Sequence, residues 1–256
     1  SRGGTWRANT YPGSACDVPS LLYSYSFARN RDWSRLFAGQ PEIRDYIEHT
    51  AAAQGVTSHV RFGVEVLRAD WDDVDARWTL ATTAGTVRAR FLVAAAGPWN
   101  EPLVPEIPGL DRFPGEVFHS ARWNHDYDLR GKRVAVVGTG ASAVQFVPEI
   151  APDVARLHLY QRTAQWVLPK PDRHLSAAER RLLTRLPGAR RLVEAIEYSL
   201  MEVLGLGFRH PWLMRRLQWI GRAQLRAQVR DPRLRRALTP DYTLGCTRLL
   251  TSHTYY

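Results

Sequence analysis

The feature that most constrains the fold is an apolar run followed by a glycine-rich turn. Residues 133–137 are Arg-Val-Ala-Val-Val, a run typical of a buried parallel strand, and Gly-Thr-Gly-Ala-Ser-Ala follows directly. Gly138 permits a tight turn, Gly140 lets the backbone approach a pyrophosphate, and Ala143 allows a helix to pack closely on the strand. A purely structural turn is the alternative. The position between strand and helix favours dinucleotide binding.

The residues after the next strand indicate which nucleotide binds. A helix to Ile150 and a strand at 156–161 complete a βαβ unit. An NAD site usually carries an acidic residue about 20 positions after the glycines, but this chain has Gln161, Arg162 and Thr163 there. A guanidinium and a hydroxyl suit a 2′-phosphate, whereas a surface arginine without a ligand is the alternative. We expect NADP rather than NAD.

Charge and composition narrow the classes of partner. The 256 residues carry a formal net charge of +10, yet residues 1–169 hold 18 basic and 18 acidic side chains, so the excess lies in residues 170–256. That last third has Arg, Leu and Ala at helical spacing and no nucleic-acid-binding motif. We expect a solvated helical surface and no nucleic-acid partner; a weak contact with an anionic membrane surface is the alternative.

The cysteines and the hydropathy add two further expectations. Cys16 and Cys246 form no CxxC pair and no metal-ligand cluster, so we expect no metal site and a reducing compartment, the cytoplasm. The sequence contains no run of 18 uncharged apolar residues long enough for a membrane-spanning helix.

Periodicity predicts the remaining elements. A helix is expected at 41–54, and strands by alternation at 60–68, 76–83 and 86–95. From residue 176 to about 237 the pattern is helical, with expected breaks at 187–188, 205–207 and 211.

A second motif indicates which kind of nucleotide-binding protein this is. Phe113, Gly115, His119 and Trp123 match FxGxxxHxxxW, and the chain resembles the Baeyer–Villiger monooxygenases, class B flavoprotein monooxygenases, whose fingerprint this is. The segments GGTW at 3–6, YPG at 11–13 and CD at 16–17 resemble the family's flavin-side segment. The resemblance implies that the fingerprint couples domain motion rather than performing bond chemistry. Asn124 departs from the Pro or Asp that often follows the tryptophan.

The resemblance implies an α/β fold with two Rossmann-like dinucleotide-binding domains, both incomplete, and a helical insertion. The expected divisions are a partial FAD domain (1–115), the first βαβ unit of an NADP domain (116–170), the insertion (171–240) and a return segment toward the NADP domain (241–256). The family's first flavin-binding turn would precede residue 3, and its catalytic arginine would follow Tyr256. The 256 residues alone are therefore expected to be inactive.

The resemblance also implies site residues for two cofactors, FAD and NADPH. Asp17 would support catalysis by pairing with the family's arginine. The residues bordering FAD would be Gly4, Thr5, Trp6, Arg7, Ala8, Asp17, Tyr23 and Val66. The residues bordering NADP would be Ala15, Cys16, Asp17, Gly138, Thr139, Gly140, Ala141, Ser142, Ala143, Val144, Gln145, Arg162 and Thr163.

The implied reaction inserts one oxygen atom from O2 into a small-molecule ketone through a C4a-peroxyflavin. Three alternatives stay open. The first is an N- or S-oxygenating flavin monooxygenase acting on a soft nucleophile. The second is a flavin disulfide reductase, which the wide cysteine spacing disfavours. The third is a non-catalytic nucleotide-binding or membrane-associated module.

Overall fold

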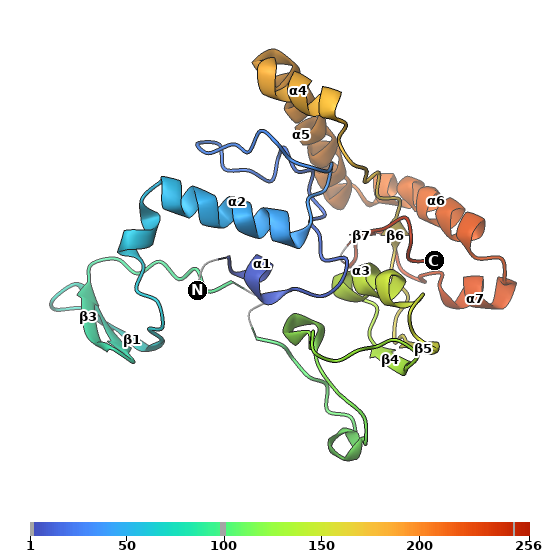
Figure 1. Cartoon of the computed structure of the whole chain (residues 1–256), viewed down its shortest axis with the longest axis horizontal. Coiled ribbons are helices and arrows are strands. Elements are labelled where there is room, and N and C mark those ends of the chain that lie inside the picture. The colour runs from blue at the N-terminus through green and yellow to red at the C-terminus, as the bar shows by residue number, and fades with distance from the viewer. Residues whose placement is uncertain (1–2, 98–100, 248) are drawn as a thin grey trace.

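The computed structural model describes residues 3–97, 101–247 and 249–256. The chain combines helices and strands as expected of an α/β protein, with one strand–helix–strand unit in its middle and a run of four helices after it (Figure 1). The α-helices are α1 (Thr5–Ala8), α2 (Gln40–Ala53), α3 (Ala141–Ile150), α4 (Ala177–Arg185), α5 (Pro187–Arg209), α6 (Pro211–Gln228) and α7 (Pro232–Ala237). The 3₁₀ helices are η1 (Val56–His59), η2 (Leu110–Arg112) and η3 (Ser120–Arg122). The strands are β1 (Val66–Asp72), β2 (Arg77–Thr82), β3 (Gly85–Ala89), β4 (Arg133–Val137), β5 (Arg156–Tyr160), β6 (Val167–Leu168) and β7 (Leu250–Thr251).

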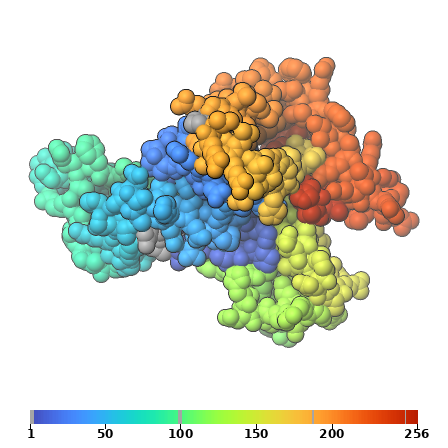
Figure 2. Space-filling model, turned by 45° about the horizontal axis from the view of Figure 1, so that its top comes forward, coloured from blue at the N-terminus to red at the C-terminus, as the bar shows by residue number. Residues whose placement is uncertain are grey.

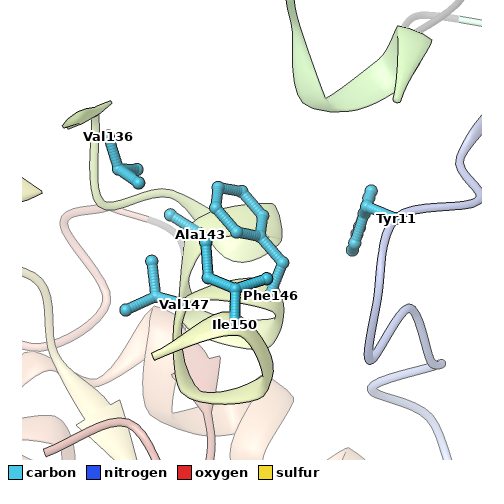
Figure 3. Close-up of a cluster of buried hydrophobic side chains, with 6 residues drawn as sticks. All are labelled: Tyr11, Val136, Ala143, Phe146, Val147 and Ile150. Atoms are coloured by element: carbon cyan, nitrogen blue, oxygen red, sulfur yellow. The ribbon is translucent and has the colours of Figure 1, made fainter. Parts of the chain in front are cut away.

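The predicted βαβ unit is confirmed in β4, α3 and β5. The two strands run parallel, with Val136 opposite Leu159. The apolar face of α3 packs on β4, and Tyr11 approaches α3 from another side (Figure 3). The buried side chains of this cluster are Tyr11, Val136, Ala143, Phe146, Val147 and Ile150. Tyr11, which is distant in sequence, therefore helps to fix the helix that follows the glycine-rich turn.

A second core contains residues of the predicted flavin-side segment. Trp33, Ile43 and Leu175 are almost fully buried around Cys16. The expected helix at 41–54 is confirmed as α2, whose N-terminal part supplies Ile43. Backbone hydrogen bonds join three stretches here: Cys16 N donates to Ala38 O at 3.0 Å and Leu175 N to Ser34 O at 2.9 Å. Segments from both halves of the chain thus meet in one core.

The antiparallel sheet β1-β2-β3 projects at one end of the molecule, far from α6 and α7 (Figures 1 and 2). The strand expected at 60–68 is wrong in its bounds, because the first strand of this sheet, β1, lies at Val66–Asp72. Gly63 turns the chain at φ +69°, so pairing begins at Val66 and extends to Asp72. The strand expected at 86–95 is also too long. The observed strand, β3, ends at Ala89, which forms the last pair with β2, opposite Trp78. Within the described residues, no strand pairs with the apolar stretch 91–95.

The helical region begins with a capping box, in which Ser176 Oγ accepts from Glu179 N and the Glu179 side chain accepts from Ser176 N. The expected interruption at 205–207 is wrong, since α5 continues to Arg209. Glycine at 207 is explained by packing: a Cβ there would collide with the Met214 side chain of α6. The break near Pro211 is confirmed, because α6 starts at that residue. Within the described part of the chain, no helix is long and apolar enough to cross a membrane.

Candidate functional site

The loop from β4 to α3 forms an open cradle at a helix N-terminus. Gly138 adopts φ +111°, a conformation that favours glycine, and its N–H donates to Tyr160 O at 2.9 Å. Gly140 is the N-cap of α3 and makes no side-chain capping bond, so the first N–H groups of the helix remain available to an anion. A Cβ at Gly138 or Gly140 would meet nothing within 4 Å. This shape fits a pyrophosphate lying against the backbone.

The residues expected to select the nucleotide lie beside this cradle. Thr139 is buried, and its Oγ1 donates to Thr163 O at 3.4 Å. Arg162, in the same turn after β5, is exposed. The structure thus brings Thr139 and the Arg162–Thr163 turn together at the carboxyl ends of two parallel strands, where α/β sheets bind ligands. The other predicted residues of this group, Ala141, Ser142, Ala143, Val144 and Gln145, form the start of α3.

The predicted flavin-side residues gather around α1. Gly4 precedes this helix, and Thr5, Trp6, Arg7 and Ala8 form it. Trp6 Nε1 donates to Tyr23 Oη at 2.9 Å, and the two rings meet edge to face with centroids 5.8 Å apart. Gln40 Nε2 donates to Trp6 O and so ties α1 to the first turn of α2. Burial raises the pKa of Tyr23, although the hydrogen bond from Trp6 opposes this, so the phenol stays protonated at neutral pH.

Two consecutive carbonyls of the predicted flavin-side segment accept hydrogen bonds from side chains of the predicted NADP domain (116–170), here called the nucleotide-binding half. Gln145 Nε2, on α3, donates to Ala15 O at 2.9 Å, and its Oε1 accepts from Tyr11 Oη at 2.9 Å. Lys170 Nζ donates to Cys16 O at 2.8 Å and lies 3.8 Å from Asp17 Oδ1. Burial raises the pKa of the Cys16 thiol, which is therefore protonated at neutral pH. The predicted Ala15 thus contacts the predicted Gln145, whereas Cys16 and Asp17 contact Lys170.

The fingerprint residues occupy a structural position. His119 caps η3, its Nδ1 accepting from Ala121 N at 3.1 Å. The Trp123 ring lies 5.2 Å from the rings of both Phe118 and Phe146, which joins the linker to α3. Phe113 is half-exposed, and Gly115 lies beside its ring. These contacts agree with a conformational role for the fingerprint, which stays a prediction.

Val66 is not brought together with the other flavin-side residues. It begins β1 in the projecting sheet and is 55% exposed. α1 contacts the first turn of α2, whereas Val66 follows the other end of this 14-residue helix, which is about 20 Å long. Only a long ligand could contact both places.

The sequence did not predict a role for Lys170 or the contact of Gln40 with Trp6. No periodicity marks either residue. One signal could have found Lys170: it is one of two lysines in a chain whose other 33 basic residues are arginine. Within the described residues, no cluster of three or more His, Cys, Asp or Glu side chains could hold a metal ion.

Comparison with known proteins identifies the family of this chain. A family model described as pyridine nucleotide-disulphide oxidoreductase matches residues 24–200, and the chain belongs to this family. It is 52% identical to a Baeyer–Villiger monooxygenase of Streptomyces coelicolor, over 100% of this chain and 50% of that protein. It is 49% identical to one of Pseudomonas aeruginosa, over 99% and 49%. The predicted resemblance is therefore confirmed.

A solved monooxygenase structure is similar to this chain in its fold. An oxidized steroid monooxygenase bound to NADP matches with a TM-score of 0.85 and 35% identity, over 100% of this chain and 57% of that one. The predicted α/β fold class is thus confirmed. The chain spans about half the length of the curated relatives it matches. The family name includes disulfide reductases, but here Cys16 is buried, Cys246 is exposed, and both thiols are free.

Proposed function

We propose that this chain is part of an FAD- and NADPH-dependent monooxygenase that inserts one oxygen atom from O2 into a small-molecule ketone. The observation that carries the proposal is the open cradle at α3 beside Arg162 and Thr163, in a chain similar over its whole length to Baeyer–Villiger monooxygenases. When bound, NADPH supplies the electrons and FAD activates O2. The chain's own residues bind and orient these groups.

Different residues of the site would hold different parts of NADPH. The N–H groups at the start of α3 would hold the pyrophosphate, because they lack capping partners. Arg162 and the Thr163 hydroxyl would hold the 2′-phosphate, because charge-assisted hydrogen bonds from guanidinium match phosphate geometry. Ala15 and Cys16, fixed by Gln145 and Lys170, would border the nicotinamide end.

For FAD, the residues around α1 fit one end of the ligand. A Cβ at Gly4 would meet nothing within 4 Å, so the backbone there faces open space. Next to Gly4, the Trp6 and Tyr23 rings are held together by a hydrogen bond and an edge-to-face contact. Val66, beyond α2, would contact the adenine end, which suits an elongated dinucleotide. Asp17 would orient the arginine that the family places beside the flavin.

We also propose that the protein divides into domains at 1–115, 116–170, 171–240 and 241–256. It would work in the cytoplasm, in keeping with its two free thiols. Its basic helical region would contact membrane surfaces at most weakly.

A substrate panel tests the reaction. The full-length protein is incubated with NADPH, O2 and matched sets of ketones, amines and sulfides, and the products are identified by mass spectrometry. Esters or lactones from ketones are the expected result. Only N- and S-oxides would favour the alternative flavin monooxygenase chemistry, which Asn124 in the fingerprint leaves open. Nucleotide binding without NADPH oxidation would favour a non-catalytic module.

A further inference from the structure

Lys170 crosses from the nucleotide-binding half to the flavin-side segment. It follows β6 by two residues, and 154 positions separate it from Cys16, whose carbonyl it contacts. Its ammonium also lies 4.9 Å from the centroid of the Phe37 ring and 3.8 Å from Asp17 Oδ1. The side chain is only 9% exposed. Three different partners therefore surround one buried cation.

Such burial is tolerated only with partners. A buried charge is costly unless it is paired and hydrogen-bonded, and here a carbonyl, a carboxylate and an aromatic face together offset that cost. Their directions fix the ammonium, and the ammonium in turn fixes the Cys16–Asp17 segment. Gln145 secures the neighbouring Ala15 carbonyl from α3. The segment is thus anchored to the nucleotide-binding half at two consecutive residues.

We propose that Lys170 is a positioning residue that holds the Cys16–Asp17 segment against the nucleotide-binding half and so sets where the Asp17 carboxylate lies. The inference rests on the proposed function for its catalytic consequence. A compact ammonium suits the place, because the broader arginine fork would have to fit between the Cys16 carbonyl and the Phe37 ring.

The first test measures the segment directly and requires no turnover. Cys16 is 6% exposed, and its Sγ accepts from Val18 N at 3.3 Å. In the full-length protein, the labelling of Cys16 by a maleimide is followed by peptide mass spectrometry, with exposed Cys246 as internal reference. Lys170→Met should accelerate Cys16 labelling about tenfold by favouring local opening. Lys132→Met removes the other lysine, an exposed one, and should leave the rate within about twofold of wild type.

The second test measures ester formed per NADPH consumed. Lys170→Met should lower this yield about fivefold, with hydrogen peroxide accounting for the lost oxygen, while the KM for NADPH changes less than about threefold. Lys170→Arg, which keeps the charge, should restore part of the yield. In an Asp17→Asn background the effect of Lys170→Met should nearly vanish, because Lys170 acts through Asp17. If Lys170→Met does not fold, Lys170→Gln carries the same expectations.

The outcomes separate this inference from the proposed function. A wild type that makes no oxygenated product refutes the proposed function, whereas the labelling rate still decides the position of the segment. An active wild type whose Lys170→Met variant matches Lys132→Met in labelling and in yield overturns the positioning role. Equal losses of yield in the wild-type and Asp17→Asn backgrounds would show that Lys170 does not act through Asp17 and would also overturn it.

Discussion

At the scale of single residues, we expect the preference between NADPH and NADH to depend on one turn, Gln161–Thr163. Arg162 is exposed beside the cradle, and Thr163 is joined to Thr139 through its carbonyl. No carboxylate stands in the Gln161–Thr163 turn to bind a ribose 2′-hydroxyl. A lone arginine can therefore discriminate between cofactors that differ by one phosphate.

Replacing that arginine should change cofactor preference. In the full-length protein, Arg162→Ala should raise the KM for NADPH roughly 10- to 150-fold, because a lost charge-assisted hydrogen bond costs about 1.5–3 kcal/mol. The KM for NADH should hardly change. Arg156→Ala, at the opposite end of β5, is the matched control and should behave as wild type. Steady-state kinetics with both cofactors measure the ratio, and an equal effect on both would contradict the assignment.

Asp17 gives the second prediction at this scale. Asp17→Ala should strongly reduce ester formation while NADPH binding is largely retained, because the carboxylate would orient the arginine that stabilises negative charge beside the flavin. Asp128→Ala, which removes an exposed carboxylate paired with Arg130, is the control. Calorimetric titration with NADP⁺ and product analysis separate the two effects. Full ester formation by Asp17→Ala would exclude Asp17 from the chemistry.

At the scale of elements, α5 carries a half-buried carboxyl group, that of Glu197. Glu197 Oε2 is inaccessible and has no hydrogen-bond partner in the described structure. Burial, and secondarily the negative charge of Glu194, raise the pKa of Glu197 to about 7. Glu194 itself pairs with Arg190 at 2.9 Å and with Arg29 at 3.3 Å. Folding thus shifts the equilibrium of the Glu197 carboxyl group toward its protonated form.

This burial should make stability depend on pH. Because the folded-state pKa lies above the unfolded value, the stabilisation from protonated Glu197 is complete below about pH 4.5 and is lost as the pH rises through about 7. After allowance for partial exposure, the loss should be about 1–2 kcal/mol of unfolding free energy. Urea unfolding at pH 5 and pH 8 measures it. Glu197→Gln should remove this component, and an unchanged pH dependence in that variant would disprove it.

At the scale of the whole molecule, what the sequence could predict depended on distance along the chain. The β4–α3–β5 unit was predictable, because strand, turn and helix follow one another within 28 residues. The start of β1 and the continuity of α5 through Gly207 were not, since strand pairing and the Met214 contact decide them. The Lys170–Cys16 contact joins residues 154 positions apart, and no local pattern encodes it.

Isotope labelling shows whether the full-length protein is an NADPH-driven monooxygenase. The full-length protein is supplied with NADPH, a ketone that it converts and ¹⁸O2 in unlabelled water, and the ester is weighed by mass spectrometry. We expect one ¹⁸O atom in each ester molecule, and no labelled ester when NADPH is withheld. An ester whose added oxygen comes from water, or NADPH oxidation that labels no organic product for any ketone, amine or sulfide, would contradict it.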